Sequence, residues 1–262
     1  MTEPILEVGH LRKEFASGRG RATVVAVDDV SFSVPPGGSL GIVGESGSGK
    51  TTLARMLLGL ELPTSGRICV AGHERERRRP SAAERRQRAR DLQIVFQNPY
   101  TSLDPRQRTG DGLDEVLRLH SGQDRRTRRE RVLQLLHQVG LDERHARSIP
   151  RDLSSGQCQR VAIARALLPE PKILVLDEAV SALDVSIQGQ ILNLLGDIRR
   201  ETGQAYVFIS HDLAVVRQVT DDLVIMRKGR VLEAGRTALI LDAPRHPYTQ
   251  LLRASVPGSG GR

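Results

Sequence analysis

The sequence predicts an α/β domain built around a mainly parallel sheet, and three observations support that fold class. Short apolar runs rich in β-branched residues alternate along the chain with runs of helical period. A glycine-rich loop joins one of these apolar runs to a helical run. The 262 residues, 39% of them hydrophobic, are enough for one domain with a buried core. Such strand–helix alternation is typical of a parallel sheet with helices on its faces.

Seven segments are expected to form strands because each is rich in apolar and β-branched residues. They are Ile5–Val8, Val24–Val34, Leu40–Val43, Leu92–Phe96, Ile173–Asp177, Tyr206–Ser210 and Leu223–Met226. Helices are expected to follow Lys50, Gly156, Val185 and His211. The clearest helix follows Val185, because one face of it collects Ile187, Ile191, Leu194, Leu195 and Ile198.

The middle of the chain differs from the rest, because no convincing strand lies between about Pro99 and Asp152. A helix flanked by charge is marked there by Val132, Leu135, Leu136 and Val139. We therefore expect a single domain over 1–262 with a helical subdomain inserted at 98–153 and a C-terminal extension at 238–262. The Gly- and Ser-rich end from Ala254 to Arg262 is expected to be disordered.

Basic residues exceed acidic ones, which gives a formal net charge of +8. Much of the excess lies in two patches, Arg75–Arg90 and Arg125–Arg131. Such patches can bind nucleic acid or anionic lipid, but more often they form a solvated face. Because only 3% of the residues are aromatic, a base-stacking platform is not expected. We therefore expect no nucleic-acid partner.

Two further features bear on the cellular compartment. Cys69 and Cys158 lie far apart and in no metal-ligand spacing, so we expect reduced, unpaired thiols. No stretch approaches the roughly 18 apolar residues of a transmembrane helix, and the N-terminus lacks the apolar core of a secretory signal. The expectation is a cytoplasmic protein.

The strand expected at Leu40–Val43 leads into a segment that fits G-x-x-x-x-G-K-[ST]. Its glycines allow backbone N–H groups to turn toward a phosphate, and the next helix presents its positive end to the same anion. Lys50 is expected to reach the β- and γ-phosphates, and the Thr51 hydroxyl to ligate Mg²⁺. This pattern predicts a P-loop NTPase core that binds MgATP. The expected nucleotide contacts are Gly44, Glu45, Ser46, Gly47, Ser48, Gly49, Lys50, Thr51 and Thr52.

Two adjacent carboxylates, Asp177 and Glu178, end the apolar strand at Ile173–Asp177. Carboxylates at the end of a buried strand are costly without a role. Asp177 is expected to hold Mg²⁺ through water, and Glu178 to polarise the water that attacks the γ-phosphate. The alternative is that the pair forms a helix cap.

The segment Leu153-Ser154-Ser155-Gly156-Gln157 indicates the family. It leads into a helix over Gln159–Leu167. By spacing alone it is either a plain helix cap or a second anion cradle. In this order and place it resembles the signature segment of ABC ATPases.

Further matches extend the resemblance over about Ile5 to Pro257. Gln97 resembles the Q-loop glutamine, Ser181–Asp184 the D-loop, and His211 the switch histidine. Phe15 resembles the aromatic that stacks on adenine, although it could instead be a core aromatic. The resemblance implies an N-terminal antiparallel β part. It also implies catalytic roles for Glu178, His211 and Gln97, and Mg²⁺ ligation by Thr51, Gln97 and Asp177.

The resemblance also implies that two such domains pair head to tail. Each ATP then lies between one phosphate loop and the partner's signature segment, so Ser154, Ser155, Gly156, Gln157 and Asp184 would serve a composite site. Two departures from the family pattern stand out. Ser155 replaces the usual glycine, which puts the efficiency of that site in doubt. Gly38 replaces a common acidic residue in a turn.

Three segments resemble the importer branch for oligopeptides, dipeptides and nickel, and its second, F-type ATPase subunit in particular. They are Val95–Pro105, Ala182–Gln188 and Pro244–Thr249. The implied partners are two transmembrane permeases, a second ATPase subunit and an extracytoplasmic substrate-binding protein, at the cytoplasmic face of the membrane. Two alternatives are a soluble ABC ATPase of translation or DNA repair and a P-loop kinase or GTPase. The motifs above argue against the second.

Overall fold

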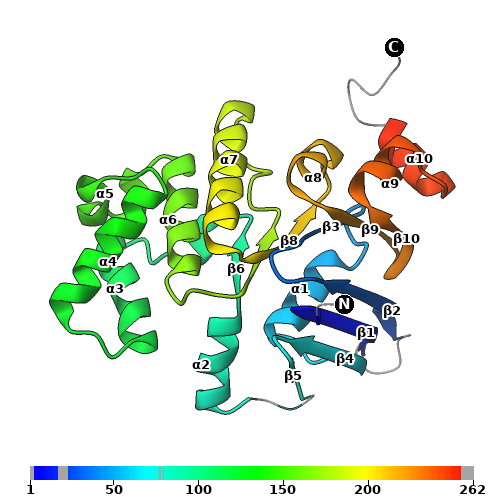
Figure 1. Cartoon of the computed structure of the whole chain (residues 1–262), viewed down its shortest axis with the longest axis horizontal. Coiled ribbons are helices and arrows are strands. Elements are labelled where there is room, and N and C mark those ends of the chain that lie inside the picture. Colours follow the sequence, from blue (N-terminus) through cyan, green and yellow to red (C-terminus); the bar gives the residue numbers. More distant parts are fainter. Residues whose placement is uncertain (1–2, 17–22, 77, 79, 255–262) are drawn as a thin grey trace. The chain divides into compact units, whose positions relative to one another are not determined.

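The computed structural model describes residues 3–16, 23–76, 78 and 80–254. The chain forms two compact units, which Figure 1 colours along the sequence. The first unit comprises Met1–Pro80 and Thr202–Arg262, and the second comprises Ser81–Glu201. Among the described residues, no helix is both long enough and apolar enough to cross a membrane.

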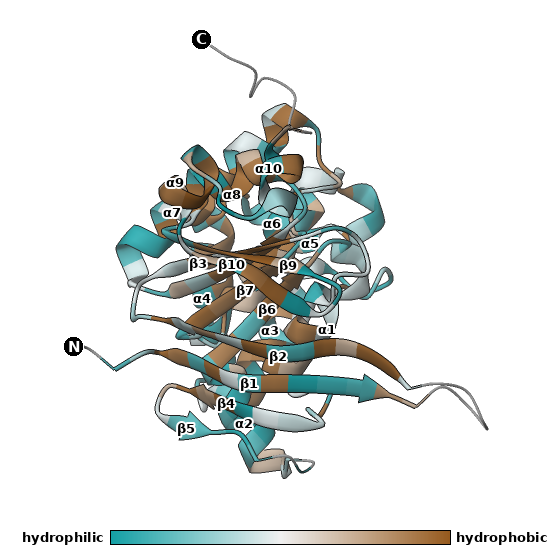
Figure 2. Ribbon diagram, turned by 90° about the vertical axis from the view of Figure 1, so that its right-hand side faces the viewer, coloured by the Kyte–Doolittle hydropathy of each residue, from teal (hydrophilic) through white to brown (hydrophobic). Residues whose placement is uncertain are grey.

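An antiparallel sheet opens the first unit, and the expected N-terminal antiparallel part is thereby confirmed. Its strand order is β2-β1-β4-β5. The strands are β1 (Leu6–Phe15), β2 (Val24–Val34), β4 (Ser65–Val70) and β5 (His73–Glu74). Figure 2 shows hydrophilic and hydrophobic stretches along both β1 and β2, as expected for strands that are buried on one face only.

The parallel strands of the first unit carry its phosphate loop. Here β3 (Ser39–Val43) pairs in parallel with β8 (Ala205–Ser210) and with β9 (Asp222–Arg227). The edge strand β10 (Arg230–Arg236) runs antiparallel to β9. All five residues of β3 are buried, as in a strand covered on both faces. The helices of this unit are α1 (Lys50–Leu58), α8 (Leu213–Val219), α9 (Thr237–Asp242) and α10 (Pro247–Ala254).

The second unit is mainly helical around one parallel pair. β6 (Leu92–Phe96) pairs in parallel with β7 (Ile173–Asp177). Its helices are α2 (Ala82–Asp91), α3 (Thr109–His120), α4 (Arg125–Gln138), α5 (Glu143–Arg147), α6 (Ser155–Leu167) and α7 (Val185–Thr202). Two short 3₁₀ turns lie at Pro99–Thr101 and Pro150–Asp152. The described chain between 98 and 153 is free of strands, and the limits of the predicted subdomain stay a prediction.

The helices α3, α4 and α5 lie together, shown in green in Figure 1. Their shared core contains Leu113, Leu117, Val132, Leu135 and Leu136. By contrast, α2 buries only Asp91, so this part of the basic run does form an exposed face. Residues 77 and 79 lie outside the described part of the chain. The expectation of disorder from Ala254 onward was wrong for Ala254, which is the last residue of α10, and residues 255–262 are not described.

Candidate functional site

The phosphate loop joins β3 to α1, and two of its glycines are required by close backbone contacts. Gly49 has φ of 103°, and a Cβ there would lie 2.3 Å from the Ala26 carbonyl oxygen. A Cβ on Gly44 would lie 2.2 Å from the Met226 carbonyl oxygen. Because Gly49 is also the N-cap of α1, no side chain caps the first amide groups of that helix. Those amides are suited to an anion.

Lys50 is 5% exposed and directs its ammonium back onto the loop. Its Nζ donates to the carbonyl oxygens of Gly44 at 2.7 Å and Glu45 at 3.0 Å. A buried ammonium needs partners of this kind. Lys50 is the only cation of the loop, and its ammonium lies where the β- and γ-phosphates are predicted to bind. On nucleotide binding, the ammonium can exchange its carbonyl contacts for phosphate oxygens.

The same loop is also hydrogen-bonded to two segments that are distant in sequence. The Gly229 amide, in the turn between β9 and β10, donates to the Ser48 carbonyl at 3.0 Å. The Glu45 amide donates to the Tyr248 hydroxyl at 3.2 Å. The sequence motifs indicated no role for Tyr248 in the site.

His211 lies directly after β8 and is exposed. The helix cap in this turn is its neighbour: Asp212 accepts a hydrogen bond from the Ala214 amide at 2.7 Å and caps α8. The Asp212 amide donates to the Ser210 hydroxyl at 2.9 Å, which fixes this turn. His211 therefore remains a candidate for the switch role.

Phe15 ends β1 and is 38% exposed, so it is not a core aromatic. The Lys13 ammonium lies 4.8 Å from the centre of its ring. An exposed ring that already attracts a cation on its π-face is suited to stacking. Its contact with adenine stays a prediction.

In the second unit, Asp177 and Glu178 lie at the carboxyl end of β7. Asp177 is 8% exposed, and Glu178 has a left-handed backbone with φ of 49°. The next helix, α7, begins only at Val185, so the alternative of a helix cap formed by this pair is wrong. A positive φ at a non-glycine residue is uncommon and is often found at functional sites.

A chain of hydrogen bonds links Gln97 to this turn. Phe96 and Asp177 are partners in the β6–β7 register, which places Gln97 and Glu178 at the same sheet edge. The Gln97 side-chain amide donates to the Ser181 hydroxyl at 3.2 Å, which donates to the Glu178 carbonyl at 2.9 Å. The structure therefore brings the predicted Q-loop, D-loop and catalytic carboxylate together.

The signature segment forms the start of α6. The Ser154 hydroxyl accepts from the Gln157 amide at 3.3 Å, and the Gln157 side chain accepts from the Ser154 amide at 2.9 Å. Ser154 and Ser155 are exposed, whereas Gly156 is buried where a Cβ would lie 2.8 Å from Ile187. The segment is therefore a helix cap whose two serines are exposed. The structure is compatible with both interpretations of its spacing, a plain helix cap and an anion cradle.

Sequence patterns missed the support behind this cap. The Gln157 side-chain nitrogen lies 3.2 Å from His145 Nε2, and His145 Nδ1 lies 2.8 Å from an Asp142 carboxylate oxygen. His145 is 6% exposed. This network ties α5 to the first turn of α6. His145 and Asp142 lie 12 and 15 positions before Gln157, and no local pattern connected them to it.

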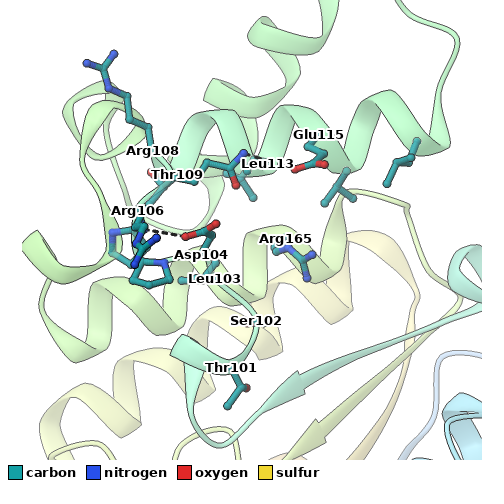
Figure 3. Close-up of a pocket in the computed structure, with 16 residues that line it drawn as sticks. Thr101, Ser102, Leu103, Asp104, Arg106, Arg108, Thr109, Leu113, Glu115 and Arg165 are labelled. Carbon is teal, nitrogen blue, oxygen red and sulfur yellow. Dashed lines mark hydrogen bonds between the residues drawn. The ribbon is translucent and has the colours of Figure 1, made fainter.

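A groove of about 730 Å³ lies beside the Q-loop segment. Figure 3 shows the Arg106 backbone amide donating to an Asp104 carboxylate oxygen within it, with Glu115 of α3 and Arg165 of α6 also lining it. Burial of part of the Arg165 side chain lowers the pKa of its guanidinium, and Glu115 acts in the opposite direction. The groove is therefore lined by both a basic and an acidic side chain.

No cluster of three or more His, Cys, Asp or Glu residues suited to a metal occurs within the described ranges. Mg²⁺ does not require one, because it usually takes one or two protein ligands besides water and phosphate. Cys69 and Cys158 are both free thiols, as expected. Burial raises the pKa of Cys158.

Comparison with known proteins identifies the family. A family model described as ABC transporter matches residues 27–181. The chain is 48% identical over 259 residues to a di/tripeptide transport ATP-binding protein, DppF, of Pseudomonas aeruginosa, covering 97% of this chain and 80% of that protein. It is 42% identical to the dipeptide transport ATP-binding protein DppF of Escherichia coli, covering 98% of this chain and 78% of that one.

A glutathione import ATP-binding protein, GsiA, of Shigella flexneri is 46% identical over 97% of this chain, which spans only 41% of GsiA. Among solved structures, a dimeric bacterial ABC transporter cassette is 28% identical with a TM-score of 0.79, covering 88% of this chain and 98% of that one. A related dimer in a post-hydrolysis state with ADP and Pi has a TM-score of 0.78, 28% identity and the same coverage. The predicted resemblance is confirmed: the chain belongs to the ABC transporter family and is an ATP-binding cassette that hydrolyses ATP.

Proposed function

We propose that this chain is the ATP-hydrolysing subunit that energises an importer of di- or oligopeptides. The observation that carries the proposal is 48% identity, over 97% of the chain, to a di/tripeptide transport ATP-binding protein. The E. coli relative, named for dipeptide transport, supports the same cargo. Nickel or another small solute is the alternative cargo. The basic helix α2 gives no reason to propose a nucleic-acid partner, because its exposed face contains no aromatic residue.

The proposed chemistry divides between the two units. In the first, Lys50 and the amide groups of Gly44–Thr52 hold the phosphates, with Thr51 on Mg²⁺. In the second, Asp177 holds Mg²⁺ through water, and Glu178 polarises the attacking water. Mg²⁺ supplies charge neutralisation at the phosphates when it is bound. Gln97 contributes to the metal shell, and His211 senses the γ-phosphate.

The outward-facing serines of α6 support a composite site. Ser154 and Ser155 are exposed rather than turned toward their own unit's core, so they are available to a second cassette. Dimeric relatives of the same fold support this pairing. We propose that Ser154–Gln157 and Asp184 serve the ATP held by a sister chain or a second copy.

The groove at Thr101–Thr109 is proposed to receive a cytoplasmic segment of the permease. It is continuous in sequence with Gln97 and with Tyr100, which is 45% exposed. A permease segment seated there would therefore be sensitive to movement of Gln97 with nucleotide state. The assembly would then lie at the cytoplasmic face of the membrane, with two permeases and an extracytoplasmic binding protein that selects the peptide.

Uptake in cells that lack this subunit tests the proposal. We expect loss of di- and tripeptide uptake, restored by the wild-type chain but not by Glu178→Gln produced at the same level. Nickel uptake measured in the same cells separates the two cargoes. Unchanged peptide uptake together with lost nickel uptake would overturn the peptide proposal, and lost export of a compound would overturn the direction.

A further inference from the structure

A single peptide unit of the phosphate loop is held from both of its polar ends. The Gly44 carbonyl accepts from Lys50 Nζ at 2.7 Å, and the amide of the same peptide, that of Glu45, donates to the Tyr248 hydroxyl at 3.2 Å. Because a peptide unit is planar and rigid, fixing its amide also fixes the direction of its carbonyl. Hydrogen bonds in such a chain also strengthen one another. Tyr248 therefore acts on the group that positions Lys50.

Tyr248 is itself held firmly in place. Its side chain is 3% exposed and packs in a core cluster with Val43, Leu213 and Ile240. The Arg227 guanidinium lies 4.6 Å from the centre of its ring, in a cation–π contact. Burial raises the pKa of the phenol, so the hydroxyl stays protonated at neutral pH. The ring is thus a rigid support rather than a surface group.

The segment before Tyr248 is anchored to the edge strand β10. The Glu233 carboxylate accepts from the amides of Arg245 at 2.9 Å and His246 at 3.2 Å. His246 Nδ1 then accepts from the Tyr248 amide at 3.1 Å and caps the start of α10. Burial opposes ionisation of Glu233, but these donors lower its pKa below the ordinary value. The carboxylate therefore remains charged and keeps the segment in register.

We propose that Tyr248 is a positioning residue for ATP binding, through which the C-terminal segment Pro244–Thr249 sets the geometry of the phosphate loop. The inference rests on the proposed ATP site and adds a role for a segment without catalytic groups. It explains why a stretch that follows the sheet and helices of the cassette is folded back to the loop. The hydroxyl, rather than the ring, is the group that acts on the loop.

Tyr248→Phe tests this role because it removes the hydroxyl and keeps the ring. We expect ATP binding, measured by equilibrium titration of the full chain, to weaken about fivefold, as for the loss of one hydrogen bond. In the assembled transporter, KM for ATP should rise by a similar factor while kcat changes little, because Glu178 is untouched. The melting temperature without nucleotide should stay close to that of wild type.

Tyr206→Phe is the matched control. Tyr206 is 1% exposed and pairs with Ser39, at the end of β3 away from the phosphate loop. The Tyr206→Phe variant should have the same dissociation constant for ATP as the wild-type chain. Equal nucleotide affinities for Tyr248→Phe and wild type would overturn the inference and leave the ATPase proposal intact. A wild-type chain that fails to bind ATP would instead overturn the proposed function.

Discussion

The helices α1 and α6 both begin where a phosphate is proposed to bind, yet they begin in different ways. The N-cap of α1 is Gly49, which has no side chain to satisfy the first amides. The N-cap of α6 is Ser154, whose hydroxyl accepts from the Gln157 amide. The start of α1 therefore needs a ligand to complete its hydrogen bonding, whereas α6 already has its own cap.

This difference separates the residues that hold ATP from those that complete its site. Around α1, the phosphate loop is supported within one unit by Lys50, Gly229 and Tyr248. At α6, His145 supports the cap through Gln157, and the exposed serines are proposed to face the nucleotide of another molecule. Substitutions near α1 should thus affect nucleotide binding, and those at α6 should affect turnover in the assembled pair.

The largest expected effect comes from Glu178→Gln, which keeps the shape of the side chain and removes its charge. We expect turnover of the assembled transporter to fall by roughly 10²–10³-fold while ATP still binds, because a general base is lost. Lys50→Ala should instead weaken nucleotide binding itself, since a charged contact to the phosphates disappears. Steady-state ATPase assays and equilibrium titration separate the two outcomes. Near-normal turnover of Glu178→Gln would contradict its assignment.

The sequence predicted most reliably the strands that are rich in apolar and β-branched residues. The strands at Val24–Val34, Leu92–Phe96 and Ile173–Asp177 match the structure to the residue. It missed α2, which has almost no apolar face and is stabilised at its start by Ser81 and Glu84. It also missed β10, an edge strand with no fully buried residue. In both, the local apolar pattern is absent, because their stability depends on a cap or a neighbouring strand.

The candidate site shows the same limit. The phosphate loop and the adjacent carboxylates were proposed from local patterns, and Gln97 from its resemblance to the Q-loop glutamine; all three assignments stay predictions. Tyr248 and the Glu45 amide lie 203 positions apart, and no local pattern connects them. The role of a residue that acts by contact across the fold depends on tertiary packing, which only the structure supplies.

The second-largest effect on ATP turnover is expected from Ser155→Gly, which tests how the start of α6 contacts the second cassette. Ser155 is exposed, and within the described part of the chain its side chain makes no hydrogen bond. In the proposed pair, its Cβ and hydroxyl lie near the partner's γ-phosphate. Removing them should raise ATP turnover of the assembled transporter a few-fold, with nucleotide affinity of the isolated chain unchanged. A lower turnover would indicate that the Ser155 hydroxyl donates to the phosphate.

The smallest effect, and the sharpest test of the comparison, concerns two matched caps. Ser81 caps α2 with Glu84 at 3.2 and 2.7 Å, much as Ser154 caps α6 with Gln157 at 3.3 and 2.9 Å. Each Ser→Ala change should reduce the free energy of unfolding by about 1 kcal/mol in chemical denaturation, since each removes one cap. Ser81→Ala should leave ATP turnover unchanged, because α2 carries no proposed site residue.

Ser154→Ala should lose the same stability and, in addition, lower turnover of the assembled transporter. Because both variants lose one helix cap, the difference in ATP turnover between them measures the contribution of the Ser154 hydroxyl to the partner's nucleotide site. If the two variants retain equal turnover, the start of α6 is a helix cap and no more. The composite site would then have to depend on the backbone of Ser155–Gln157, and the contrast between α1 and α6 would lie in their side chains alone.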